Sequence, residues 1–316
     1  MRNSHYLRLW GPIQRYSRGT HVIMADRQIK RAIKEGTVIF DDSMGNAKAV
    51  VTHKPTKKWF MISGGWGNDN VYTAMMGAVC GDVVGSVYER DNIKHKPDKE
   101  HLVQPRARFT DDSVMTCAVA EGIRLGLSQL PKEWLNAPEH ERVLKECIRD
   151  AMLLYGRKYP RAGYGSGFRS WLGSSNPQPY HSYGNGSAMR ASYAGWAARS
   201  LEEAEKLGEI SASVTHNHPE GIKGARVTAG CIFLLRAYGD KNKIREYAGQ
   251  YYDLNFTLDG IRPTYAFDSS CAGTVPPAIV AFLEGTDFAD VIANAISIGG
   301  DSDTVAAIAG SLAEVI

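Results

Sequence analysis

Two short clusters of acids and hydroxyls are the residues of this sequence best suited to chemistry. They are Thr110-Asp111-Asp112 and Asp301-Ser302-Asp303-Thr304. Each stands where an irregular segment gives way to helical spacing, and together they offer carboxylate and hydroxyl oxygens. Hard cations such as Mg²⁺ prefer oxygen ligands, whereas zinc prefers nitrogen and sulfur. The pattern therefore predicts a site for Mg²⁺ or a similar ion.

A simpler interpretation of either cluster alone is a helix N-cap. Asp, Ser and Thr commonly cap helices, and acids interact favourably with the first turn. One cap needs only one such side chain, however, and adjacent acids repel each other. The ion hypothesis explains the surplus acids, so we prefer it for the two clusters taken together.

Two glycine-rich turns precede helical segments and could bind an anion. They cover residues 161–168 and 183–190. Backbone N–H groups at a helix start favour phosphate, and two such turns would suit a diphosphate. No strand precedes either turn, so neither is a Rossmann fingerprint. An ordinary flexible loop is the alternative for each turn alone.

Two further candidates are informative only together with the acidic clusters and the glycine-rich turns. His216 and His218 stand ahead of Pro219 without the additional nitrogen or sulfur ligands that zinc needs, so we expect His216 to cap a helix or to bind a ligand. A surface role is the alternative. Glu89 could act as an acid near the ions or the substrate, and its alternative is an exposed helix-end glutamate. No serine-nucleophile elbow is present, which favours water positioned by a metal.

The segments that must position these residues are predicted to be helices. No strand-like alternation follows residue 70, so residues 71–316 read as one all-α domain. Gly77, Gly81 and Gly85 share one helix face, for which we prefer tight helix packing over ligand contact as the explanation. Apolar residues recur at helical spacing in 71–88, 112–126, 141–156, 187–199, 219–238, 289–298 and from 303 to the end, with loops at 156–186 and 253–276.

Residues 1–70 differ from the rest and form a separate basic extension. They hold 12 Lys or Arg against 5 Asp or Glu, whereas the whole chain carries a net charge of only +3. Three β-leaning runs at 37–40, 49–52 and 59–62 predict a small meander. A glycine-rich linker follows, and we place the domain boundary near residue 70.

Composition excludes several classes of protein. The five cysteines are scattered and form no Cys-x-x-Cys pair, which argues against a zinc knuckle or a disulfide framework and fits a reducing compartment. No run approaches the ~20 apolar residues of a membrane span. The net charge is too small to indicate nucleic acid by itself. We therefore expect a cytoplasmic protein without a nucleic-acid or membrane partner.

Taken together, the motifs resemble one family, the ADP-ribosylglycohydrolases. This family includes dinitrogenase-reductase-activating glycohydrolase and the ADP-ribosylarginine and ADP-ribosylserine hydrolases. One motif alone would not be specific, but all occur in family order across residues 71–316. The strings that carry the resemblance are residues 77–85, 110–112, 163–167, 184–190, 215–219 and 299–304.

The resemblance implies an all-α fold, two Mg²⁺ ions and hydrolysis of the C1″ bond that joins ADP-ribose to a modified protein side chain. It implies catalytic roles for Asp111, Asp112, Asp303 and Glu89. The implied metal ligands are Thr110, Asp111, Asp112, Asp301, Asp303 and Thr304. The implied substrate-binding residues are Gly163, Gly165, Ser166, Gly167, Asn185, Gly186 and His216.

Some relatives with an added N-terminal arm are immunity proteins against ADP-ribosyltransferase toxins. Residues 1–70 lie outside the family core, and their early part mixes arginines with aromatic residues, which dominate binding hot spots. We expect this arm to bind and block a cognate toxin; a packing or dimer arm is the alternative. Arginine is the expected acceptor. The rival functions are a non-catalytic inhibitor on the same fold, and an ADP-ribosylserine hydrolase without an immunity role.

Overall fold

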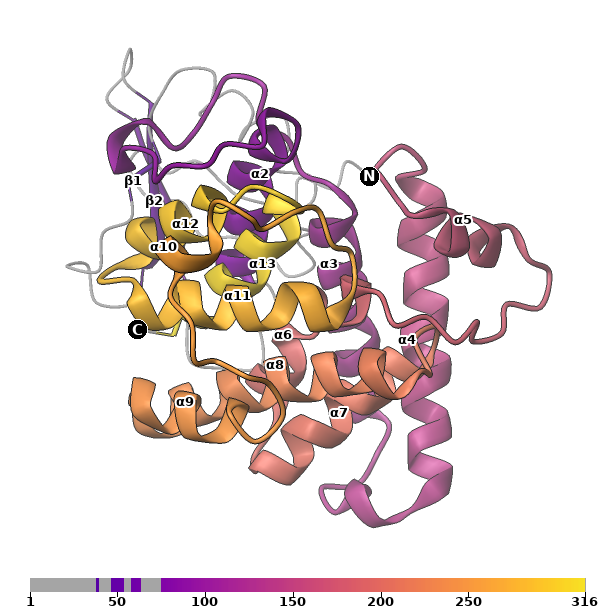
Figure 1. Ribbon diagram of the computed structural model, residues 1–316. Coiled ribbons are helices and arrows are strands. Elements are labelled where there is room, and N and C mark those ends of the chain that lie inside the picture. Colours follow the sequence, from indigo (N-terminus) through magenta and orange to yellow (C-terminus); the bar gives the residue numbers. More distant parts are fainter. Residues whose placement is uncertain (1–37, 40–46, 54–57, 64–74, 316) are drawn as a thin grey trace.

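The computed structural model describes residues 38–39, 47–53, 58–63 and 75–315. Helices dominate residues 75–315, and no strand occurs among them, which confirms the all-α prediction (Figure 1). No helix in the described ranges is long and apolar enough to cross a bilayer. The longer helices are α2 (Met76–Asp91), α3 (Asp111–Ser128), α4 (Pro138–Lys158), α7 (Leu201–Ser213), α8 (Pro219–Tyr238), α11 (Cys271–Glu284), α12 (Phe288–Ser297) and α13 (Ser302–Ala313).

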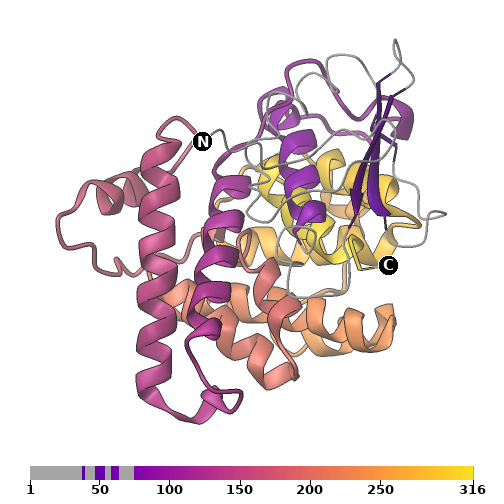
Figure 2. The same ribbon diagram turned by 180° about the vertical axis from the view of Figure 1, so that it is seen from behind.

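Shorter helices and single turns connect the longer ones. The short α-helices are α5 (Ser166–Gly173), α6 (Ser192–Ala197), α9 (Lys241–Ala248) and α10 (Leu258–Ile261). The 3₁₀ turns are η3 (Lys99–His101), η4 (Trp134–Asn136) and η5 (Asn185–Ser187). Seen from both sides, α3 and α4 lie side by side, as do α7 and α8 (Figures 1 and 2).

Several segments differ from the sequence prediction, and α9 is a helix that was not expected. The helix expected over 187–199 is only α6, preceded by η5. Helix α11 begins inside the predicted loop 253–276 and carries Pro276 and Pro277, which normally disfavour a helix interior. Most of its residues, both prolines included, are buried, so tertiary packing outweighs the local preference. Helix α7 was not predicted at all.

The predicted meander is confirmed as a three-stranded antiparallel sheet in the order β1-β2-β3. The strands are β1 (Val38–Ile39), β2 (Ala47–His53) and β3 (Lys58–Ser63), with a register irregularity near Ala47. The arm proposed for partner binding covers residues 1–70, which lie outside the described residues apart from these three strands.

The glycine face of α2 packs directly on α13, as preferred from the sequence. A Cβ atom on Gly77 would lie 2.1 Å from the carbonyl oxygen of Gly310, and one on Gly81 would lie 2.0 Å from that of Ala306. Real Cβ contacts are never that short, so only glycine allows the two backbones to approach this closely. This contact brings the C-terminal half of α2 beside the start of α13.

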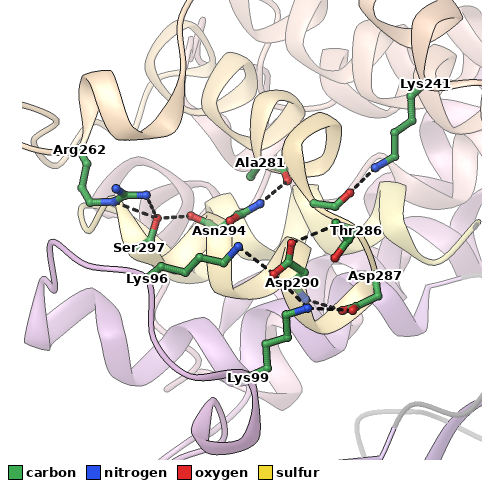
Figure 3. A network of polar contacts seen from close by, with 11 residues as sticks. Lys96, Lys99, Lys241, Arg262, Ala281, Thr286, Asp287, Asp290, Asn294 and Ser297 are labelled. Atoms are coloured by element: carbon green, nitrogen blue, oxygen red, sulfur yellow. Dashed lines mark hydrogen bonds and ion pairs between the residues drawn. The ribbon is translucent and has the colours of Figure 1, made fainter.

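The segment 92–110, between α2 and α3, is fastened to α12. The ammonium groups of Lys96 and Lys99 lie 2.8 and 3.1 Å from Asp290 Oδ1, and Lys99 also contacts Asp287 (Figure 3). Burial alone would raise the pKa of Asp290, but hydrogen bonds from Lys96, Lys99 and the Thr286 backbone lower it to about 2. The network anchors the connection between two elements that carry site acids.

Candidate metal centre and substrate turns

The two acidic clusters stand at helix starts, as the sequence predicts. Thr110 is the N-cap of α3, and its hydroxyl accepts a hydrogen bond of 3.3 Å from the Asp112 backbone. The cap interpretation is therefore correct for Thr110. Asp301 is the N-cap of α13 but makes no side-chain cap. Capping leaves the carboxylates of Asp111 and Asp301 unexplained.

Packing brings the two clusters together although they are about 190 residues apart in sequence. Carboxylate oxygens of Asp82, Asp112 and Asp303 lie within 4.8 Å of one another, and so do those of Glu89, Asp301 and Asp303. The Thr304 hydroxyl donates to Asp112 Oδ2 at 3.3 Å, which joins the starts of α3 and α13 directly.

The cluster is electrostatically unfavourable without a cation. Burial, and then repulsion from neighbouring acids, raises the pKa values of Asp112 and Asp303 well above the usual value of an aspartate. The same two causes raise the pKa of Asp111 to about 7. Asp112 Oδ1 is buried and has no hydrogen-bond partner among the described residues. A buried unpaired carboxylate oxygen is costly, and a hard cation is the partner that this donor set fits.

Asp82 is a site residue that the sequence reasoning missed. It is fully buried, and its carboxylate accepts hydrogen bonds from the Thr110 backbone (2.9 Å) and hydroxyl (2.7 Å) and from the Ser113 backbone (3.0 Å) and hydroxyl. It thereby fixes the first turn of α3. The available signal was a single acid within the otherwise apolar and glycine-rich run 76–88.

The first glycine-rich turn lies against the acid cluster. Gly163 has φ +121°, a backbone conformation that favours glycine, and a Cβ atom there would lie 2.9 Å from Asp111 Oδ1. Gly165 is the N-cap of α5 and provides no side-chain cap, so N–H groups of the first turn are left for another acceptor. Ser166 and Gly167 are exposed beside it. The predicted anion-binding turn thus adjoins the predicted metal site.

The second turn is also adjacent to the cluster, but it leads into the three-residue η5 rather than directly into a helix. Its Asn185 N–H is bound to the Ser269 carbonyl at 2.7 Å, and binding of an anion by the turn stays a prediction. The turn also contributes a side chain to the cluster. Asn185 Nδ2 donates to Asp301 Oδ2 at 2.8 Å and to the Thr274 hydroxyl at 3.0 Å.

The two histidines have separate roles. His218, not His216, caps a helix, because its Nδ1 accepts from the Glu220 backbone at 3.0 Å at the start of α8. His216 is buried, and its Nε2 would lie 3.2 Å from a Cβ atom on Gly186. The cap role expected for His216 is therefore wrong, and its contact with a ligand at this turn stays a prediction.

Tyr183 is a second residue that the sequence reasoning did not select. It immediately precedes Gly184, 57% of its surface is exposed, and its ring packs edge-on against His218 with centroids 5.6 Å apart. An exposed ring at the rim of a ligand turn can stack on a planar group. The signal was an aromatic residue directly before a glycine-rich turn.

These turns and acids fall within one recognised domain. A family model described as ADP-ribosylglycohydrolase matches residues 67–313. The chain belongs to this family. The sequence resemblance is therefore confirmed at the level of the family, and it covers every residue of the site described above.

Individual relatives share a low sequence identity with this chain. ADP-ribosylhydrolase ARH3 of Homo sapiens is 25% identical over 76% of this chain and 83% of its own length. The Bos taurus protein of the same name is 25% identical over 76% of this chain and 82% of its own length. A solved ADP-ribosylglycohydrolase-related protein complex shares the fold at TM-score 0.52 and 21% identity, covering 77% of this chain and 87% of that one.

Proposed function

We propose that this chain is a Mg²⁺-dependent hydrolase that removes ADP-ribose from modified protein side chains. The observation that carries the proposal is the meeting of two ligand turns and two acidic helix starts. Gly163 adjoins Asp111, and Asn185 is hydrogen-bonded to Asp301. A diphosphate held at the first turn would lie beside cations held by the acids. Family membership supports the same reaction class.

The ligands proposed for two ions are Thr110, Asp111, Asp112, Asp301, Asp303 and Thr304. When bound, the ions supply positive charge that orients ribose hydroxyls and polarises water. This chain's own acids supply negative charge around the oxocarbenium-like centre at C1″.

Proton transfer is assigned to the acids beside that centre. One of Asp111, Asp112 and Asp303 accepts a proton as the water oxygen bonds to C1″. The acceptor side chain leaves with the electron pair of the broken bond. The pKa of Glu89 is raised by burial and then by Asp301, a direction that favours a general-acid role for Glu89 toward the leaving group.

Release of ADP-ribose from arginine-linked and serine-linked proteins, with and without Mg²⁺, tests the proposal. Turnover should require Mg²⁺ and should be abolished in Asp111→Asn combined with Asp303→Asn. Asp150→Asn is the matched control, because Asp150 is an exposed acid on α4 paired with Arg149. Arginine is the acceptor expected from the family resemblance, and serine-only turnover would assign the alternative linkage. No release from either substrate by folded protein would reject the function.

The rival function is a non-catalytic inhibitor on the same fold. Such a protein has no need for mutually repelling buried acids, whose raised pKa values weigh against this rival. Mg²⁺ binding without any turnover would favour it.

We further propose, from the sequence alone, that the N-terminal extension binds and blocks an ADP-ribosyltransferase toxin. Its basic charge and mixed arginine and aromatic residues support the proposal. Deleting residues 1–66, ahead of the family-matched region, should abolish toxin binding while ADP-ribose release persists. Loss of both functions in a misfolded product would make the extension structural.

A further inference from the structure

A buried arginine lies behind His216 without an acidic partner. Only 1% of the surface of Arg190 is exposed, and no carboxylate among the described residues pairs with it. Burial lowers the pKa of its guanidinium to about 10. A buried cation without a counter-charge is costly, so its contacts call for an explanation.

The guanidinium makes two hydrogen bonds through Nη2. One reaches the Ser211 carbonyl at 3.1 Å, near the C-terminal end of α7, where a positive charge is favourable. The other reaches the Thr215 hydroxyl at 2.8 Å. The first contact is structural. The second contact is to Thr215, whose hydroxyl is in turn in contact with His216.

The Thr215 hydroxyl connects this cation to His216. Its oxygen lies 2.6 Å from His216 Nδ1, and Thr215 is fully buried. Arginine can only donate, so the hydroxyl oxygen accepts from Arg190 and its single proton remains for another acceptor. Among the described residues, His216 Nδ1 is the acceptor in reach. The oxygen has a second lone pair that could accept from Nδ1–H, but the buried hydroxyl proton would then lack an acceptor. The geometry therefore favours an unprotonated Nδ1, with the proton of the neutral imidazole on Nε2.

The other ring nitrogen faces the ligand turn. Cβ atoms on Gly186 and Gly184 would lie 3.2 and 3.5 Å from His216 Nε2, so the two glycines leave room there. The ring is held from a further side by Tyr180, with centroids 5.9 Å apart. Burial, and then the charge of Arg190, lower the pKa of His216 well below its usual value, which agrees with a neutral ring.

We propose that Arg190 is a positioning residue that acts through Thr215 to fix His216 as the Nε2–H tautomer, a permanent hydrogen-bond donor to the ligand at the Gly184–Gly186 turn. The ligand atom would be an acceptor oxygen of the nucleotide, such as a phosphate or ribose oxygen. That identity rests on the proposed function, whereas the tautomer does not.

Nitrogen-15 NMR of the histidine rings in the full chain at neutral pH tests the tautomer without any substrate. His216→Gln assigns the signal among the nine histidines. The wild-type protein should show a protonated Nε2 and an accepting Nδ1. A protonated Nδ1, or an imidazolium, would overturn the proposal.

Variants test the chain of contacts. Thr215→Val should lose the fixed tautomer and weaken binding of ADP-ribose about tenfold, as expected for one hydrogen bond to a charged ligand. Thr215→Ser should restore both. Thr228→Val is the matched control, because the hydroxyl of this buried threonine donates to the Gly224 carbonyl within α8 itself. An unchanged His216 signal in folded Thr215→Val would refute the role of Thr215.

Arg190→Met tests the first step. Without the arginine donor, the Thr215 hydroxyl can accept from His216, so part of the population should shift to Nδ1–H. A folded Arg190→Met with the wild-type His216 signal would overturn the role of Arg190. If Arg190→Met does not fold, Arg190→Lys is measured instead and should show part of the same shift toward Nδ1–H. If the protein does not bind ADP-ribose but shows the Nε2–H signal, the positioning of His216 by Arg190 and Thr215 is upheld and only the proposed function is rejected.

Discussion

A Cβ atom on Gly85 of α2 would lie 2.5 Å from the Cα atom of Asp303 at the start of α13. No side chain fits between these two residues, so the packing of two helices determines where a predicted metal ligand stands. Gly85 also faces the Ser302 carbonyl at the same distance. The position of the acid cluster therefore depends on a residue that carries no side chain.

Gly85→Ala should push α13 away from α2. We expect the free energy of unfolding to fall by about 1–3 kcal/mol, the usual cost of overpacking, and Mg²⁺-dependent turnover to fall with it. Thermal unfolding and the ADP-ribose release assay measure the two effects. Gly173→Ala serves as the control, because no described residue beyond the adjacent backbone of α5 comes within 4 Å of its Cβ position. Equal behaviour of the two variants would contradict the packing argument.

Asn185→Asp should weaken the metal site. The amide that donates to Asp301 at 2.8 Å would be replaced by a carboxylate facing another carboxylate. Substitutions of residues that support metal ligands typically cost about 10- to 100-fold in metal affinity, and we expect Mg²⁺ affinity to fall by this factor. Calorimetric titration with Mg²⁺ measures it. Asn176→Asp, at an exposed position, should leave the affinity unchanged.

Asp82→Asn should disorder the first turn of α3. The carboxylate accepts from both N–H and hydroxyl groups of Thr110 and Ser113, and an amide nitrogen would face one or more of these donors. Loss of a buried, charge-assisted network should lower the free energy of unfolding by about 3 kcal/mol. Denaturant unfolding measures the loss. Asp259→Asn provides a control because Asp259 is 86% exposed. If Asp82→Asn is as stable as the wild-type protein, the proposed role of Asp82 in fixing the first turn of α3 is wrong.

Mg²⁺ should stabilise the protein more at high pH than at low pH. The pKa of Asp111 in the metal-free fold is raised from 3.8 to about 7, so the folded state binds more protons than the unfolded state between these values. Stability of the metal-free protein contributed by this group therefore falls as pH rises from about 4 to about 7. A cation favours the ionised cluster and offsets that loss.

The measurement is the shift in thermal midpoint on adding Mg²⁺ at pH 6 and at pH 8. We expect the larger shift at pH 8, and a smaller pH dependence of the shift in Asp111→Asn. The same shift at both pH values in the wild-type protein would show that the cation does not compete with protons at these acids.

Much of the site could be predicted because its signals are local. Doubled acids at Thr110-Asp111-Asp112, glycines before helices and a histidine pair are read from neighbouring residues alone. The structure brings all of them together. The differences arose where a local pattern has two meanings: His218 rather than His216 caps α8, and the turn at Asn185 leads into a 3₁₀ turn and contributes an amide side chain to the cluster.

The sequence by itself determined the helical character, the kinds of ligand atom and the family, since these depend on composition, spacing and motif order. The tertiary structure decided which polar groups are buried together. Asp82 becomes a support for Thr110 only because α2 packs beside α3, and Arg190 reaches Thr215 only because α7 ends next to it. Burial and hydrogen-bond direction arise from segments distant in sequence, so no local pattern could have predicted them.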